Sequence, residues 1–125
     1  MKVTDVNKLN DTFKVGDVVW GCEFAYNEQK ANANKTQRPI KGILSSFRYE
    51  KDYMANKNNS MGFINYFIPL KNDGKTPSWQ KAIKAYSLKY ASTEDECKEI
   101  YNDIINKNIK WHKNEIGRLK KELLN

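Results

Sequence analysis

The sequence predicts an α+β fold, in which a small N-terminal antiparallel β-sheet is followed by a long C-terminal helical segment. Short runs of β-branched and aromatic residues, separated by polar or glycine-containing segments, occupy residues 13–90. A helix-capping pattern then appears at residues 92–96, and the chain is helix-forming from there to its C-terminus. With 125 residues, the chain has room for one domain but not for two separate cores. We therefore treat residues 1–125 as a single domain.

The first two strands are expected within residues 13–49. Residues 13–22, FKVGDVVWGC, supply β-forming residues around a Gly-Asp pair that indicates a bulge or tight turn. The same F-x-V-G-D-x-V pattern opens many small SH3-like barrels. Residues 23–37 are polar and are expected to form a loop. A second strand, bent at Gly42, is expected over residues 38–49.

The remainder of the sheet is expected within residues 51–90. Residues 51–60 are polar and predict a second loop, and the aromatic and aliphatic residues of 61–70 predict a third strand buried on both faces. The Asn-Asp-Gly sequence within 71–75 is typical of a tight turn. Residues 79–90 fit either a helical stripe or a strand. We favour a strand, because a hairpin turn precedes the segment and a new helix start follows it.

The helix is expected from about residue 94 to residue 124. Either Ser92 or Thr93 can cap it, and three acids in its first turn suit the positive end of the helix dipole. Apolar residues in its first half and in its second half follow stripes that are out of phase, so we expect a kink or a short break near Asn106. The second stripe, called here the heptad seam, has four-three spacing. It consists of Ile105, Ile109, His112, Ile116, Leu119 and Leu123.

The heptad seam indicates a homo-oligomer, a dimer or larger, formed through the C-terminal helix. So long a seam at the end of so small a domain suits another helix better than the chain's own sheet. Gly117 costs about 1 kcal/mol relative to alanine within a helix, so we expect a close approach of two helices there.

The chain is expected to act in the cytoplasm without a membrane partner. Its apolar runs fall far short of the roughly 18–20 residues that a membrane span needs. The N-terminal sequence MKVTDVNKLN lacks the hydrophobic region of a signal peptide. Two cysteines, Cys22 and Cys97, do not make a disulfide framework, and this favours a reducing compartment.

The net charge of +7 lies entirely in residues 1–93, because residues 94–125 hold seven acids and seven bases. The same N-terminal part contains thirteen of the fifteen aromatic residues. Amines can pair with phosphates while aromatic rings stack on bases, so this composition suits nucleotides or nucleic acid. An AT-rich coding bias toward lysine and asparagine would give the same composition, and both explanations stay open.

The residue inventory favours a binding protein without catalysis, metal or cofactor. The one histidine, His112, lies on the heptad seam, and neither cysteine is near it in sequence. The acids lie in solvated helix turns or loops, where no environment would separate the pKa values of a pair. The sequence contains no P-loop, no dinucleotide-binding glycine motif and no H-E-x-x-H motif.

Arginines and large aromatics are the candidate ligand-binding residues. Arg38 and Arg48 flank the second expected strand, and Arg118 lies in the terminal helix. The guanidinium fork suits bidentate phosphate contacts. Arg118 could instead pair with Glu115 or Glu122 on a neighbouring turn. The candidate stacking rings, each with core packing as the alternative role, are Trp20, Tyr49, Trp79 and Tyr90.

The chain resembles a known viral family in its organisation. The stretch FKVGDVVWG at residues 13–21, the stretch WQKAIKAYSLKYASTEDE at residues 79–96 and the long helical tail are similar to the phage anti-Thoeris sponge proteins. A local likeness lies in residues 86–94 and in the Ile-Tyr-Asn sequence of residues 100–102. These small proteins sequester a cyclic ADP-ribose signal made by bacterial TIR-domain enzymes.

The resemblance implies a non-catalytic oligomer in the host bacterial cytoplasm. Its C-terminal helices would interlock, and the nucleotide would be held intact in pockets between protomers. Some members also bind cyclic oligonucleotide signals at separate, arginine-lined sites. In this chain, Tyr90 would stack on the adenine and Asn102 would be a polar partner at the base of the pocket. Arg118 and Arg48 would contact the phosphates.

Three function classes therefore remain open. The first is capture of a small cyclic nucleotide signal, and the second is a basic, SH3-like nucleic-acid-binding module. The third is an assembly protein whose heptad seam is its whole function. Salt separates the first two, because polynucleotide binding weakens steeply as counterions are released and a one-ligand pocket loses far less. We favour the first class, with a polynucleotide partner not expected.

Overall fold

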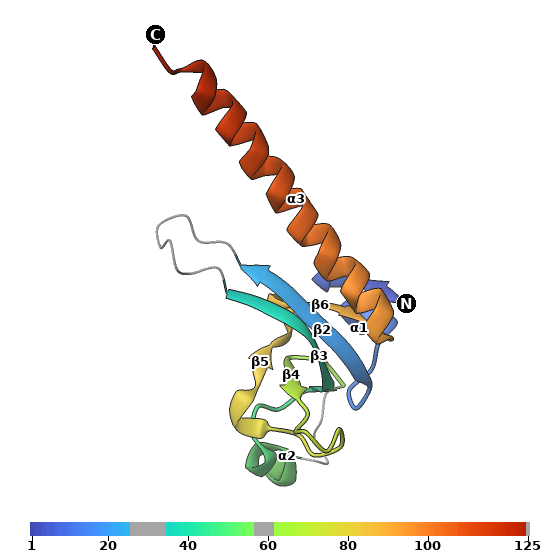
Figure 1. The fold of residues 1–125 in the computed structure, drawn as a ribbon. Helices are drawn as coiled ribbons and strands as arrows, with labels where there is room; N and C mark the ends of the chain where they lie inside the picture. The colour runs from blue at the N-terminus through green and yellow to red at the C-terminus, as the bar shows by residue number, and fades with distance from the viewer. Residues whose placement is uncertain (26–34, 57–61, 125) are drawn as a thin grey trace.

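The structure, a computed structural model, describes residues 1–25, 35–56 and 62–124 (Figure 1). Within these residues it contains one antiparallel sheet in the order β1-β6-β2-β3-β4-β5, followed by a long helix, which confirms the predicted α+β class. The strands are β1 (Lys2–Val3), β2 (Val18–Ala25), β3 (Lys35–Ser45), β4 (Tyr66–Pro69), β5 (Ile83–Lys84) and β6 (Lys89–Ala91). The helices are α1 (Leu9–Thr12), α2 (Glu50–Asn56) and α3 (Glu94–Lys121), and the short 3-10 turns are η1 (Val6–Lys8), η2 (Trp79–Lys81) and η3 (Ala85–Ser87).

Strands β2 and β3 form the centre of the sheet. Strand β2 begins at Val18, later than predicted, because the chain before it turns at Gly16, where φ is +98°. Its pairing with β3 shifts register between Gly21 and Glu23. Gly42 of β3 is required by packing, since a Cβ there would lie 2.4 Å from the Phe67 ring. The predicted bend at this glycine thus coincides with a close approach of ring to backbone.

Several expected boundaries were wrong. The polar segment 51–60 was predicted to be a loop, but α2 occupies Glu50–Asn56, with Tyr53 edge-on to Phe47 at 6.1 Å between ring centroids. The third strand is shorter than predicted. The segment 79–90 is strand only in β5 and β6, with η2 and η3 beside them. The part of the predicted 23–37 loop at residues 26–34 lies outside the described residues.

Two hydrophobic clusters hold the molecule together. The larger cluster joins the N-terminal segment to the sheet through Leu9, Phe13, Phe67 and Tyr90, among others. The smaller one packs the first turns of α3 on the sheet. It consists of Cys22, Ala91, Cys97 and Ile100, with Trp20, Tyr101 and Ile104 at its margin.

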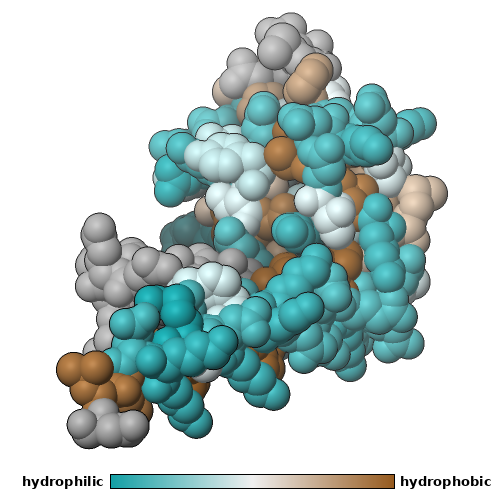
Figure 2. Space-filling view, turned by 90° about the horizontal axis from the view of Figure 1, so that it is seen from above, coloured by the Kyte–Doolittle hydropathy of each residue, from teal (hydrophilic) through white to brown (hydrophobic). Residues whose placement is uncertain are grey.

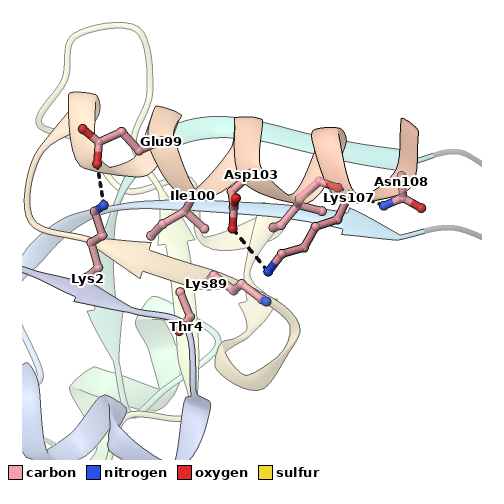
Figure 3. Close-up of a pocket in the computed structure, with 9 residues that line it drawn as sticks. Lys2, Thr4, Lys89, Glu99, Ile100, Asp103, Lys107 and Asn108 are labelled. Atoms are coloured by element: carbon pink, nitrogen blue, oxygen red, sulfur yellow. Dashed lines mark hydrogen bonds and ion pairs between the residues drawn. The ribbon is translucent and has the colours of Figure 1, made fainter. Parts of the chain in front are cut away.

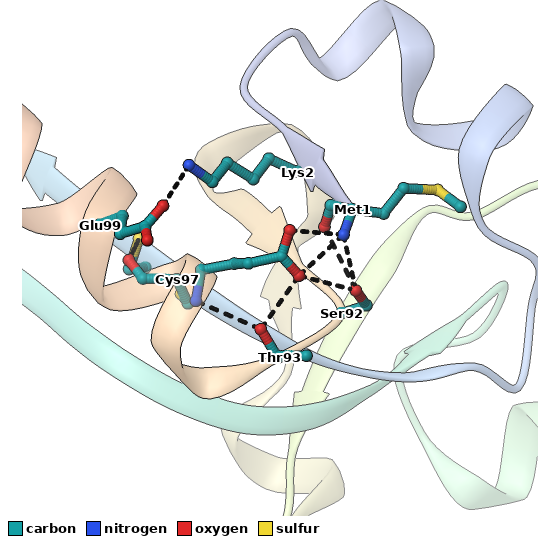
Figure 4. Close-up of polar contacts among 8 residues, drawn as sticks. Met1, Lys2, Ser92, Thr93, Cys97 and Glu99 are labelled. Atoms are coloured by element: carbon teal, nitrogen blue, oxygen red, sulfur yellow. Dashed lines mark hydrogen bonds and ion pairs between the residues drawn. The ribbon is translucent and has the colours of Figure 1, made fainter.

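Helix α3 begins where the sequence predicted. The Thr93 side chain accepts a hydrogen bond from the Glu96 backbone N–H at 3.2 Å, as a capping residue does. The Glu96 carboxylate also binds the amino group of Met1 at 2.6 and 2.7 Å, and the Ser92 hydroxyl accepts from the same amino group at 2.9 Å (Figure 4). Lys2 pairs with Glu99 one turn later. We call this set of contacts the amino-terminal clasp.

The predicted break near Asn106 is wrong. Helix α3 is a single helix of 28 residues, about 42 Å long at 1.5 Å per residue. The Asn108 side chain donates to the Ile104 carbonyl at 3.1 Å and leaves the helical backbone intact. No proline or glycine lies between residues 104 and 116, so nothing in the backbone forces a kink there.

The second half of α3 extends beyond the sheet (Figure 1). Most of the heptad seam is exposed in the single chain, with Ile116 at 53% and Leu119 at 55%. No described atom lies within 4 Å of a Cβ built on Gly117, and the predicted close helix contact stays a prediction. The face seen in Figure 2 is largely hydrophilic, with separate apolar areas. Among the described residues, no helix combines the length and apolarity needed to cross a membrane.

Candidate functional site

Tyr90, the predicted stacking aromatic, is a core residue. Its side chain has no exposed surface, and its ring lies 5.6 Å from the Phe67 ring between centroids. Its hydroxyl donates to the Ala85 carbonyl at 2.6 Å, and burial raises the pKa of that hydroxyl. A ligand therefore has no ring face to stack on, and the stacking role predicted for Tyr90 is wrong. Tyr90 does lie where the sheet meets the helix, but its ring is buried in the core and does not line a cleft.

Three further predicted site residues are not brought together as one ligand site. Trp20 of β2 is half-buried and packs beside the cluster under α3. Asn102 is exposed on α3. The Arg118 guanidinium pairs with Glu115 at 3.1 Å, which is the alternative that the sequence left open. Asn102 and Arg118 are separated by about 24 Å along the helix, so one small ligand cannot contact both in a single chain.

Tyr49, by contrast, lines a cavity together with Trp79, and Arg48 lies over the Tyr49 ring. Tyr49 and Trp79 line a cavity of about 540 Å³ between the start of α2 and η2, and Lys71 and Lys81 lie at its wall. We call it the Trp79 cavity. The guanidinium carbon of Arg48 lies 5.1 Å from the centre of the Tyr49 ring. One predicted site residue, Tyr49, thus lines this cavity, and a second, Arg48, contacts the Tyr49 ring.

A rigid turn positions one side of the Trp79 cavity. The Asp73 carboxylate accepts hydrogen bonds from the Thr76 hydroxyl and from the backbone N–H groups of Thr76 and Lys75, the latter two at 2.8 Å. These bonds, chiefly those from Thr76, lower the pKa of Asp73 to about 2. Gly74 adopts a φ of +71°, which the turn requires. The turn confirms the prediction for residues 71–75 and fixes Lys71 and Trp79 on neighbouring backbone.

The start of α2 positions the opposite side. The Tyr49 carbonyl accepts from the N–H groups of Asp52 and Tyr53 at 3.0 and 3.2 Å, which holds Tyr49 at the first turn of the helix. From that turn the Lys51 ammonium lies 5.5 Å from the centre of the Tyr49 ring. Arg48 and Lys51 therefore both lie over this ring, in the geometry of cation–π contacts.

The electrostatics of the Trp79 cavity are positive. Within the described residues, its four nearby cations form no ion pair, and one carboxylate, that of Glu50, lines the cavity. Two of these cations, Lys71 and Lys81, line the cavity, and the other two, Arg48 and Lys51, lie over the ring of the lining residue Tyr49. Across the same described ranges, the Trp79 ring has no aromatic or cationic partner. The arrangement can hold a planar ring and several negative charges at once.

Sequence reasoning missed the three lysines of this site. Lys51 lies in a segment expected to be a loop, and Lys71 and Lys81 are two among nineteen lysines. The sequence did contain one signal for Lys71. This lysine directly precedes the Asn-Asp-Gly turn and Trp79 follows the turn, so the two residues lie on either side of it. Trp79 itself was recognised only as one of four candidate rings.

Comparisons with known proteins return no relative. No family model matches the chain, and no curated protein or solved structure matches it either. Among the described residues, no three metal-binding side chains gather at one place.

Proposed function

We propose that this protein captures a small nucleotide signal of the cyclic ADP-ribose type in the Trp79 cavity and holds it without breaking a bond. One observation carries the proposal: within the described residues, a tryptophan ring without a ring partner shares a cavity with Lys71 and Lys81, and neither lysine forms an ion pair. A nucleobase would stack on Trp79, and the pyrophosphate would lie near Lys71 and Lys81. The site of action would be the bacterial cytoplasm, against the signalling step of an anti-phage defence.

The dimensions of the cavity suit such a ligand. Its volume of about 540 Å³ falls within the roughly 300–1,000 Å³ typical of small-molecule sites. A single base stacked on one aromatic ring gains about 1–3 kcal/mol, and lysine and arginine add charge-assisted bonds to phosphate. A single-stranded polynucleotide would use the same groups, and the salt dependence of binding distinguishes it.

The cavity lining favours binding over turnover. Glu50 is the one carboxylate among the described lining residues, and no histidine or cysteine belongs to the lining. A hydrolytic site that works by general acid–base catalysis needs two proton-transfer groups of separated pKa. Sequestration requires none, because the ligand returns unchanged.

Self-assembly through the heptad seam is the second part of the proposal. Ile109, Ile116 and Leu119 are each about half exposed in the single chain, on a helix half that has no sheet to cover it. Pairing with another copy would bury these side chains. Several cavities in one oligomer would then remove several signal molecules.

Equilibrium dialysis with cyclic ADP-ribose tests the proposal. Trp79→Ala should weaken binding about 5- to 150-fold, because it removes one stacked ring. Tyr86→Ala is the matched control. Tyr86 is an exposed tyrosine with the Lys84 ammonium 5.8 Å from its ring, but it lies outside the Trp79 cavity. Affinity should be unchanged in this control.

The fate of the bound molecule is the decisive measurement. After long incubation and heat denaturation of the protein, chromatography should return cyclic ADP-ribose quantitatively unchanged. Loss of the molecule at a rate that Trp79→Ala abolishes would show an enzyme instead. Equal affinity of wild type and Trp79→Ala would place the ligand elsewhere, and tighter, steeply salt-dependent binding of single-stranded DNA would favour the nucleic-acid module.

A further inference from the structure

A second cavity lies at the other end of the strand order from the Trp79 cavity. It has a volume of about 600 Å³ and runs between α3 and the edge formed by β1 and β6 (Figure 3). Two isoleucines of α3, Ile100 and Ile104, give it an apolar wall, and Lys89 of β6 points into it. We call this cavity the α3 groove.

The charges in the α3 groove are unevenly matched. Lys2 pairs with Glu99, and the Lys107 ammonium pairs with Asp103 at 3.3 Å (Figure 3). Each of these two ammonium groups therefore has its own carboxylate. Across the described ranges, no carboxylate lies within 4.0 Å of the Lys89 ammonium. Among the described residues that line the groove, Lys89 is thus the one ammonium without a paired carboxylate, and the acids Asp5 and Glu23 line an adjoining cavity that Lys89 also faces.

Strand pairing holds the backbone around Lys89: β2 pairs with Lys89 itself, and β1 pairs with the next two residues, Tyr90 and Ala91. Strand β6 lies between β1 and β2, and Lys89 itself is opposite Cys22 in the register with β2. The Lys89 side chain is half-buried, with the nearly buried Ile100 across the groove. Within the described residues the Lys89 ammonium has no paired carboxylate, so a bound anion would supply one, and the sheet holds the backbone that carries this side chain.

We propose that the α3 groove binds an organic monocarboxylate with an apolar, aromatic or branched body. The carboxylate pairs with the Lys89 ammonium, and the apolar body lies against Ile100 and Ile104. A ligand with a single negative charge matches the groove, because Lys2 and Lys107 are already paired with carboxylates of the groove. A ligand with several phosphates would meet Glu99 and Asp103 and be repelled. This second site is distinct from the Trp79 cavity in position, charge and ligand.

Paired probes test the carboxylate requirement on the full-length protein. The fluorescent probe 2-naphthoate carries the charge and an apolar body, and 2-naphthamide has the same shape without the charge. Equilibrium dialysis should show naphthoate binding at least about tenfold more tightly than naphthamide, as expected for a charge-assisted hydrogen bond. Equal binding of the two probes to wild-type protein would overturn the proposal without any variant.

Variants assign the difference to Lys89. Lys89→Gln should abolish the preference for naphthoate, and Lys89→Arg should keep it. Lys113→Gln is the matched control, since it removes one exposed positive charge from α3 outside the groove. Trp79→Ala, which tests the proposed function, should leave the preference unchanged. Should Lys89→Gln lose its helical circular dichroism, Lys89→Met serves in its place.

Each remaining outcome has a defined meaning. A naphthoate preference that persists in folded Lys89→Gln or Lys89→Met contradicts the proposal. Its loss in Lys113→Gln would show a general charge effect, and its loss in Trp79→Ala would place the probe in the Trp79 cavity. Both of those results overturn the α3 groove as a carboxylate site, and neither depends on whether cyclic ADP-ribose is bound.

Discussion

The two halves of α3 are one helix with opposite properties. The docked half, residues 94–104, holds five acids and one base, and its Cys97 and Ile100 are buried against the sheet. The extended half, residues 105–121, holds six bases and one acid, and its apolar residues are exposed. The docked half is stabilised by contacts within the chain. The extended half presents exposed apolar side chains, although the helix continues through both halves without a break.

The largest difference between the halves should appear in the free energy of unfolding. Ile100→Ala leaves a cavity beside Cys22 and Cys97 and should cost about 2–5 kcal/mol. Ile116→Ala, the same change in the extended half, should alter the stability of the isolated chain by no more than about 0.5 kcal/mol. Urea denaturation at concentrations where the chain is monomeric measures both. Equal costs would mean that the extended half is packed within its own chain.

The extended half should in turn determine the oligomeric state, and therefore the molar mass measured in solution. The double variant Ile109→Lys and Leu119→Lys places two charges on the heptad seam and should give a folded monomer by light scattering. A matched double variant, Asn106→Lys and Asn114→Lys, adds the same charge at exposed positions off the seam. It should keep the oligomer. A seam variant with unchanged mass would remove the seam as an interface.

The docked half should also respond to acid through Glu96. The Met1 amino group and the Thr93 hydroxyl lower the pKa of this carboxyl, so its stabilising contribution is complete above its unfolded pKa. That contribution is lost as the pH falls through the lower, folded pKa. The urea midpoint of wild type should therefore fall on acidification below about pH 4.5, and Glu96→Gln should flatten the fall. A parallel loss in wild type and variant would assign the acid sensitivity to other groups.

The smallest effect is expected from the ion pair of the extended half. Arg118 and Glu115 are paired at the surface, where such pairs contribute about 0.2–1 kcal/mol at most. Arg118→Ala should change the urea midpoint little and leave nucleotide affinity unchanged. A marked loss of affinity would instead bring Arg118 into the ligand site, through a neighbouring copy in the oligomer.

The comparison also explains what the sequence could predict. The start of α3 was correct because capping is local: Thr93 and Glu96 are three residues apart, and their chemistry needs no other part of the fold. The break at Asn106 was wrong because the change in phase of the apolar stripe was interpreted as a change of backbone. The change in phase marks where the apolar side of the unbroken helix stops packing on the sheet and becomes exposed.

The candidate site was less predictable, because burial is set by the whole fold. Tyr90 looks the same in sequence whether its ring faces a cleft or the Phe67 ring, and only packing decides between them. Arg48 and Tyr49 were recognised by residue type. Trp79, which shares the cavity with Tyr49, lies thirty residues later in the chain, and the turn at Asp73 and the first turn of α2 bring the two together.

The amino-terminal clasp has a consequence for the order of folding. Met1 and Glu96 are 95 positions apart, and β1 completes the sheet edge only by pairing with β6. Contacts of such long sequence separation carry a large loop-closure entropy and form slowly. The hydrogen bonds of the extended half join residues four apart and can form within microseconds. During synthesis, β1 cannot pair until residues 89–91 of β6 have been made, and this edge of β6 stays unpaired until Lys2 and Val3 reach it.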